Sequence, residues 1–157
     1  GHDSPFAFDL GYKAGAGISR MRVGTPPIVQ MAALDAALDI WDDVDMNDVR
    51  SRSIELSERF IAGVESTCPD LTLASPRDAT QRGSQVSFTF AEGYAAMQAL
   101  IAHKVIGDFR APNIMRFGFT PLFLNERDID QAVEILARIM RDRLWDTPEF
   151  KQRKAVT

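Results

Sequence analysis

The stretch QVSFTF, residues 85–90, alternates polar and apolar side chains without interruption. Such alternation is typical of a β-strand that packs one face on a core. We therefore expect Val86, Phe88 and Phe90 to face the core. Three further short segments indicate strands of the same small sheet: residues 71–73, 105–109 and 114–119.

Helical patterns precede these strands. Thr25 can cap a helix with its hydroxyl, and Pro26 suits the first helical position, where no N–H is needed. Apolar side chains then recur at helical spacing and predict a core-facing stripe: Ile28, Met31, Leu34, Leu38 and Trp41. A second helix is expected to begin at Asp45 and to end at residues 68–70. We expect the two helices to form an antiparallel pair.

Two more helices are expected among and after the strands. Residues 94–103 indicate a short helix, and Asn125, with Asp128 three residues later, is typical of the start of a last one. The order of the elements predicts an α+β fold, in which helices cover one face of a small, mainly antiparallel sheet. The chain then divides into three parts: a loop at residues 1–24, a domain at 25–145 and a polar tail at 146–157.

Length and composition restrict the function. A chain of 157 residues, 45% hydrophobic and 25% charged, is typical of one soluble domain. Its net charge of −4 argues against a nucleic-acid partner, and no apolar run is long enough to span a membrane. The 2 histidines and the single cysteine, Cys68, indicate neither a metal site nor an internal disulfide. We expect a cytoplasmic protein.

The beginning of the chain leaves two explanations open. Gly1-His2 stands where an initiator methionine is expected, and no signal peptide follows. By itself this start fits either a cloning scar or a piece of a longer protein. The glycine-rich loop that follows is long for a compact domain, and such loops are often functional.

The first candidate site is the motif Val23-Gly24-Thr25-Pro26-Pro27. Free N–H groups at a helix N-terminus, together with a capping hydroxyl, can bind a phosphate or a carboxylate. An ordinary helix cap explains the same residues equally well. Arg20 and Arg22 precede the motif, and two interpretations are open for them as well. They can contact an anion, or they can be solvated or paired with nearby carboxylates.

The second candidate is Arg116, which stands alone in an apolar strand. Alternation places Met115, Phe117 and Phe119 on one face and Arg116 on the other, where Gly118 leaves space beside it. A guanidinium in such a setting can bind a carboxylate through two hydrogen bonds. The alternative is an arginine that points to water or pairs internally.

Several segments resemble the carboxy-terminal part of the kynureninase family, whose members have an aspartate-aminotransferase-like fold and use pyridoxal 5'-phosphate. The matching segments, in order, are Gly1-His2, RVGTPPI at 22–28, RGSQVSF at 82–88, NIMRF at 113–117 and Pro121-Leu122. Their joint order carries the resemblance, which runs to about Met140. The resemblance favours Gly1-His2 as native sequence. It also implies that residues 1–24 belong to the large cofactor-binding domain and residues 25–145 to the C-terminal small domain.

The resemblance implies four site residues. Thr25 would contact the cofactor phosphate across a homodimer interface, and Arg116 would hold the α-carboxylate of the substrate. His2 would lie near the aromatic ring of the substrate, and Gly24 would shape that pocket at a position where relatives carry serine. The Schiff-base lysine of the family belongs to a segment before Gly1. The resemblance therefore places no catalytic residue and no metal in this chain.

The resemblance also implies an activity for the full-length protein. This would be hydrolysis of the Cβ–Cγ bond of L-kynurenine to anthranilate, or of 3-hydroxykynurenine to 3-hydroxyanthranilate, with release of L-alanine. The reaction belongs to tryptophan catabolism and NAD biosynthesis, and the segment alone is expected to be inactive. Two alternatives stay open: another enzyme of the same fold, cysteine desulfurase-like or aminotransferase-like, and a non-catalytic interaction domain.

Overall fold

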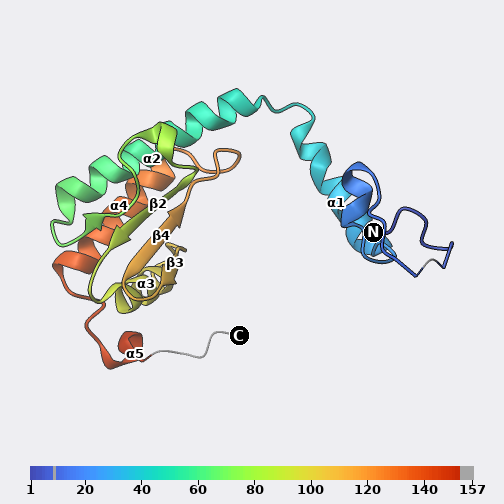
Figure 1. Cartoon of the computed structure of the whole chain (residues 1–157). Coiled ribbons are helices and arrows are strands. Elements are labelled where there is room, and N and C mark those ends of the chain that lie inside the picture. Colours follow the sequence, from blue (N-terminus) through green and yellow to red (C-terminus); the bar gives the residue numbers. More distant parts are fainter. Residues whose placement is uncertain (9, 153–157) are drawn as a thin grey trace. The chain divides into compact units, whose positions relative to one another are not determined.

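The chain divides into two compact units, residues 1–44 and the residues from Asp45 onward (Figure 1). The computed structural model describes residues 1–8 and 10–152. The predicted change of domain between residues 24 and 25 concerns the longer protein and stays a prediction. Within the described residues, no helix combines the length and the hydropathy needed to cross a bilayer.

The second unit contains an antiparallel sheet of four strands. Along the chain these are β1 (Thr72–Leu73), β2 (Gln85–Thr89), β3 (Asp108–Arg110) and β4 (Ile114–Gly118). In space their order is β1-β2-β4-β3. The predicted α+β class, with a small antiparallel sheet, is therefore confirmed.

Strand β3 begins later than the sequence predicts, because the residues before it close the preceding helix. Lys104 takes a left-handed conformation with φ of 70°, and Val105 N donates a hydrogen bond to Leu100 O at 2.9 Å. At Gly107 the backbone passes very close to β4, where a Cβ would lie 2.6 Å from the carbonyl oxygen of Arg116. Glycine at this position allows β3 to pair with β4.

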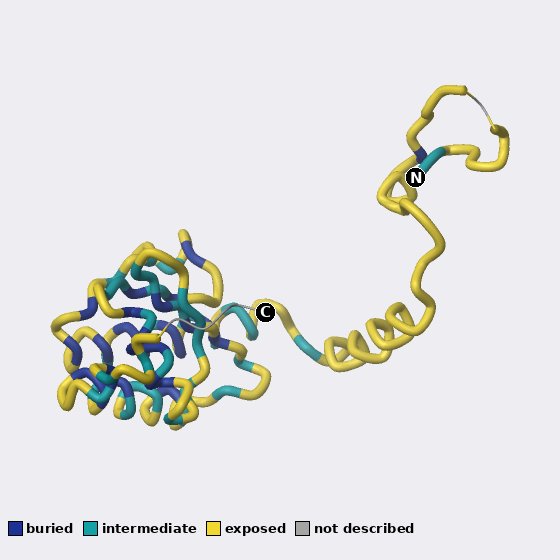
Figure 2. Tube along the Cα trace, turned by 90° about the horizontal axis from the view of Figure 1, so that it is seen from below, coloured by how far each residue is buried: buried dark blue, intermediate teal, exposed yellow. Residues whose placement is uncertain are grey.

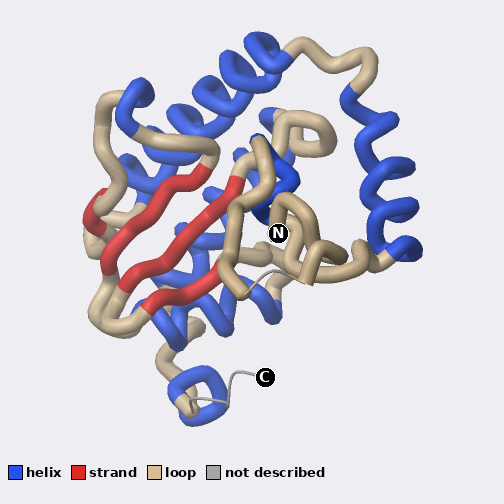
Figure 3. The backbone as a smooth tube through the Cα atoms, turned by 45° about the vertical axis from the view of Figure 1, so that its right-hand side comes forward, coloured by secondary structure: helices blue, strands red, loops and turns tan. Residues whose placement is uncertain are grey.

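Three helices cover one face of the sheet (Figures 1 and 3). They are α2 (Met46–Thr67), α3 (Gly93–Ala102) and α4 (Glu126–Arg141). Asp45 caps α2 by accepting a hydrogen bond from Asn47 N at 2.7 Å. Asn125 and Asp128 form a reciprocal capping box at the start of α4, as their spacing predicts. A short helix, α5 (Pro148–Lys151), lies in the predicted polar tail, of which residues 153–157 are outside the described part.

The core lies between the sheet and these helices. Phe60 of α2 packs against three aromatic rings of the sheet region, at centroid distances of 6.1 Å for Phe88, 4.9 Å for Phe117 and 5.4 Å for Phe119. Helices α2 and α4 cross closely at Gly63, where a Cβ would lie 2.9 Å from the methyl groups of Val133. The core thus fixes β2 and β4 by their apolar faces and leaves their polar faces turned away from it.

The first unit contains η1 (Gly17–Met21), α1 (Ile28–Leu38) and η2 (Asp39–Trp41). Within this unit no residue of α1 is buried, so the unit alone does not supply the predicted core-facing stripe (Figure 2). Met31, Leu34 and Leu38 are 50–52% exposed. Since α1 and α2 belong to different units, the antiparallel pair stays a prediction.

The predicted Thr25 cap is wrong. The N-cap of α1 is Pro27, no side chain caps the helix, and the Pro27 carbonyl accepts a hydrogen bond from Met31 N at 2.9 Å. The reason is local, because a residue that precedes a proline disfavours the helical region. Thr25 and Pro26 both precede a proline, so the helical conformation is disfavoured at both residues, and the observed helix begins at Ile28.

Candidate functional site

Arg116 lies on β4 and projects from the face opposite the helices. Its neighbours Met115 and Phe117 are 0% and 5% exposed, whereas the Arg116 side chain is 30% exposed. The predicted alternation of this strand is therefore confirmed. Ser87 of β2 and Asp108 of β3 are the direct cross-strand partners of Arg116. The three residues form one row across the sheet.

Asp108 binds one side of the Arg116 guanidinium. Arg116 Nε donates to Asp108 Oδ1 at 2.6 Å, and Nη2 donates to Oδ2. These hydrogen bonds lower the pKa of Asp108 below its ordinary value, which keeps the group a carboxylate. Arg110 Nη2 lies 3.4 Å from the same Oδ2. Two cations therefore share one carboxylate, and the group carries net positive charge.

The other end of the guanidinium is available to a ligand. A guanidinium offers five N–H donors in a planar fork, and a carboxylate can pair with either the Nε/Nη2 side or the Nη1/Nη2 end. Asp108 takes the side, and no acceptor among residues 1–8 and 10–152 bonds to Nη1. Gly118, two residues along the same face, leaves space in which a Cβ would meet no atom within 4 Å. This arrangement can bind a second carboxylate end-on.

A hollow of about 700 Å³ in the first unit brings together the other three predicted site residues. His2, Gly24 and Thr25 all line it, together with Arg20 and Arg22. Neither arginine forms an ion pair with a carboxylate in the described part of the chain. A threonine hydroxyl and arginine guanidinium groups are side-chain groups suited to binding a phosphate dianion. Arg116 belongs to the other unit.

The loop that carries His2 is closed by its own hydrogen bonds. Gly15 N donates to Gly1 O at 2.9 Å, and the Tyr12 hydroxyl donates to the same oxygen at 3.1 Å. His2 Nδ1 accepts from Ser4 N at 2.9 Å, and Nε2 lies 3.2 Å from Gly11 O. Both ring nitrogens of His2 are thus engaged by the loop backbone, which fixes the ring plane at the edge of the hollow.

Known proteins match the whole chain. A family model described as "Kynureninase C-terminal domain" matches residues 49–136. The chain belongs to the kynureninase C-terminal domain family. Proteins named kynureninase from Burkholderia mallei (strain SAVP1) and Pseudomonas fluorescens are 46% and 43% identical over 100% of the chain. The chain spans 38% of the length of these relatives.

A solved structure shares the fold. A "NIFS-LIKE PROTEIN" superposes on 83% of this chain and 38% of its own, with a TM-score of 0.64 and 14% sequence identity. At this level of identity the likeness shows the fold alone. It agrees with the C-terminal small domain that the kynureninase resemblance implies.

In this member of the kynureninase C-terminal domain family, sequence reasoning missed Asp108. The signal was present in the hairpin between β3 and β4, where a short turn pairs Arg110 with Ile114 and therefore Asp108 with Arg116. Opposite charges directly across an antiparallel pair attract one another. Counting back from the turn at Pro112 identifies the partner of Arg116.

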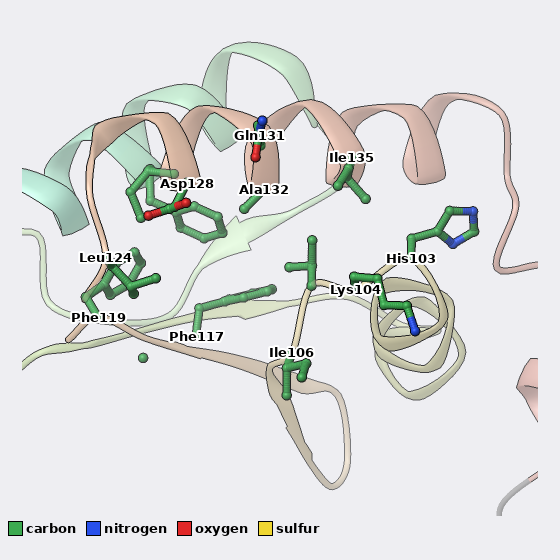
Figure 4. Close-up of a pocket in the computed structure, with 14 residues that line it drawn as sticks. His103, Lys104, Ile106, Phe117, Phe119, Leu124, Asp128, Gln131, Ala132 and Ile135 are labelled. Atoms are coloured by element: carbon green, nitrogen blue, oxygen red, sulfur yellow. The ribbon is translucent and has the colours of Figure 1, made fainter. Parts of the chain in front are cut away.

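An apolar pocket of about 350 Å³ lies elsewhere in the family domain (Figure 4). Phe117, Phe119 and Ile135 line it from the helix-covered side of the sheet, and His103 and Lys104 lie at its rim. Because Arg116 points to the opposite face of β4, this pocket is separate from the carboxylate-binding end of the guanidinium.

Other chemically interesting residues have structural explanations. His103 Nδ1 lies 2.8 Å from Ala99 O at the end of α3, so the ring is engaged by the helix backbone. Cys68 is buried, and its burial raises the pKa of the thiol, which disfavours the nucleophilic thiolate. No cluster of metal-ligating side chains occurs in the described part of the chain.

Proposed function

We propose that this chain is the C-terminal part of a kynureninase-like hydrolase. The full-length protein then cleaves the Cβ–Cγ bond of L-kynurenine or 3-hydroxykynurenine and releases L-alanine. Family membership and the similarity to proteins named kynureninase support this activity. The observation that carries the role of this segment is the guanidinium of Arg116, whose Nη1/Nη2 end faces away from Asp108.

Arg116 binds the α-carboxylate of the amino-acid substrate in this proposal. Two parallel hydrogen bonds fix both the position and the plane of a carboxylate, which a single ammonium group does not do. Holding the amino-acid end in one orientation keeps the scissile bond in a productive geometry. Arg116 remains charged throughout and transfers no proton.

Thr25 holds the phosphate of pyridoxal 5'-phosphate in this proposal, from the neighbouring subunit of a homodimer. The hollow lined by Thr25, Arg20 and Arg22 fits this group, because its lining includes a hydroxyl residue and two arginines that form no ion pair within the described residues. When bound, the cofactor supplies an electron sink for the carbon chemistry. The chain itself supplies anchoring and charge.

His2 and Gly24 bind the aromatic part of the substrate in this proposal. They line the same hollow as Thr25, and a side chain added at Gly24 would meet no atom within 4 Å. Glycine therefore keeps that wall open to a substituted ring. We further propose a cytoplasmic enzyme of tryptophan catabolism and NAD biosynthesis.

Replacement of Arg116 in the full-length protein tests the function. We expect Arg116→Ala to raise the KM for L-kynurenine by about 100-fold or more, because two charge-assisted hydrogen bonds are lost. The absorbance spectrum of the bound cofactor should not change. Arg116→Lys keeps the charge but not the fork and should recover only part of the loss.

Two results would contradict the proposal. Unchanged kinetics in Arg116→Ala would remove the carboxylate role. A wild-type protein that leaves L-kynurenine intact but releases sulfur from cysteine, or transfers an amino group to a keto acid, would assign it to another activity of the same fold.

A further inference from the structure

Asp108 is the one acidic side chain that bonds to Arg116 within the described residues. The two strands place these residues directly opposite one another, and both oxygens of Asp108 accept hydrogen bonds from the guanidinium. The contact uses the Nε/Nη2 side of the fork, and no acceptor among residues 1–8 and 10–152 bonds to Nη1. An ion pair made only to neutralise Arg116 could use either position equally well.

Asp108 is itself held in place. It begins β3, and its backbone is aligned by the close approach of Gly107 to the Arg116 carbonyl oxygen. Arg110 lies on the same strand and contacts the same carboxylate oxygen. Asp108 is therefore a fixed anchor rather than a mobile surface group.

Without this anchor, the guanidinium would be free to rotate. Arg116 is a long side chain on a partly exposed face, and Gly118 leaves the space beside it empty. A long side chain loses rotamer freedom when it binds a ligand, unless another contact has already fixed it. Asp108 restricts Arg116 before the ligand arrives. Because Arg110 balances the charge of Asp108, the cluster still attracts an anion.

We propose that Asp108 is a positioning residue, which holds Arg116 by its side so that the Nη1/Nη2 end is oriented to bind a carboxylate. This inference rests on the proposed carboxylate role of Arg116. It assigns to Asp108 a contribution to recognition of the carboxylate, beyond stability. The consequence is discrimination between an α-amino carboxylate and the matching carboxamide.

Equilibrium binding to the full-length protein separates positioning from stability. The probes are L-alanine and L-alaninamide, whose dissociation constants are measured by calorimetry for the wild type and Asp108→Asn. We expect Asp108→Asn to weaken L-alanine binding by about tenfold, as for a lost charge-assisted contact, and to leave L-alaninamide within about twofold. In an Arg116→Ala background, Asp108→Asn should have no further effect, because the residues act as one unit.

Asp130 provides a matched control. Arg59 Nε and Nη2 donate to its two oxygens at 2.6 and 2.7 Å, which is the same side-on geometry on other elements. Asp130→Asn should change neither dissociation constant. Asp108→Glu keeps the negative charge, so it serves if Asp108→Asn does not fold. Asp108→Glu displaces the carboxylate. We therefore expect its ratio of the L-alaninamide to the L-alanine dissociation constant to lie between the ratios of the wild type and Arg116→Ala.

Three results with Asp108→Asn would overturn the inference: equal weakening of the binding of both probes, unchanged L-alanine binding, or additive effects of Asp108→Asn and Arg116→Ala. A wild-type ratio in Asp108→Glu would equally contradict positioning by exact geometry. Failure of the proposed function is recognised separately. If the wild-type protein binds L-alanine more tightly than L-alaninamide but does not cleave L-kynurenine, the proposed activity is contradicted. The positioning role of Asp108 is then still supported.

Discussion

A single arginine on a sheet can serve two carboxylates at once, because its fork has two distinct bidentate positions. In this chain Asp108 occupies one position of Arg116 and leaves the other exposed. The sequence predicts the arginine and its face from alternation alone. It does not reveal Asp108 until the register of the hairpin is known, since pairing depends on the turn as well as on the strand pattern.

For Thr25, in contrast to Arg116, the sequence-based prediction of its local structure is wrong. The sequence predicts a helix cap, and the structure places the start of the helix after Pro27. The hydroxyl of Thr25 is therefore not committed to the helix and remains available on the hollow that it shares with Arg22. Two consecutive prolines, rather than the cap preference of threonine, determine where α1 begins.

Replacement of Thr25 tests the cofactor assignment. In the full-length protein, Thr25→Ala should weaken retention of pyridoxal 5'-phosphate by about tenfold, since one hydrogen bond to a dianion is lost. Thr25→Ser keeps the hydroxyl and should retain the cofactor as the wild type does. Fluorescence titration of the apoprotein gives the dissociation constants. An unaltered constant in Thr25→Ala would remove the assignment.

At the scale of elements, α2 and α4 are joined by an ion pair as well as by the core. Arg52 Nη2 of α2 lies 2.5 Å from Glu126 Oε2, at the first residue of α4. This contact lowers the pKa of Glu126 from 4.5 to about 2. Because the pKa in the folded state is depressed, the stabilising contribution is complete above about pH 4.5 and is lost as the pH falls towards about 2.

The pairing can be measured by nuclear magnetic resonance. Arg52→Gln should return the titration midpoint of Glu126 from about 2 towards its ordinary value of 4.5. Arg141→Gln, which removes the partner of Asp142 at the far end of α4, should leave the midpoint of Glu126 unchanged. A Glu126 midpoint that stays the same in Arg52→Gln would exclude this ion pair in solution.

The elements of the second unit are largely predictable because each carries a local signal. Asn125 and Asp128 give the capping box of α4, and the alternation of residues 85–90 gives β2. The start of β3 escapes prediction, since it depends on how the end of α3 is closed around Lys104. That closure depends on the left-handed conformation of Lys104, which hydrophobic periodicity does not indicate.

For the whole molecule, the apolar pattern of α1 indicates burial that the first unit does not provide by itself. Its side chains at Met31, Leu34 and Leu38 are about half exposed in the first unit. The relatives are longer, and the chain spans 38% of their length. A sequence period shows that a helix face favours burial, but it does not show which part of a protein covers it.

The most direct test is a crystal structure of the full-length protein with L-alanine bound. We expect the ligand carboxylate to accept hydrogen bonds from Nη1 and Nη2 of Arg116 at about 2.7–2.9 Å, while Asp108 keeps its contact with Nε. A carboxylate bound by other groups, with that end of Arg116 turned to solvent, would contradict this expectation.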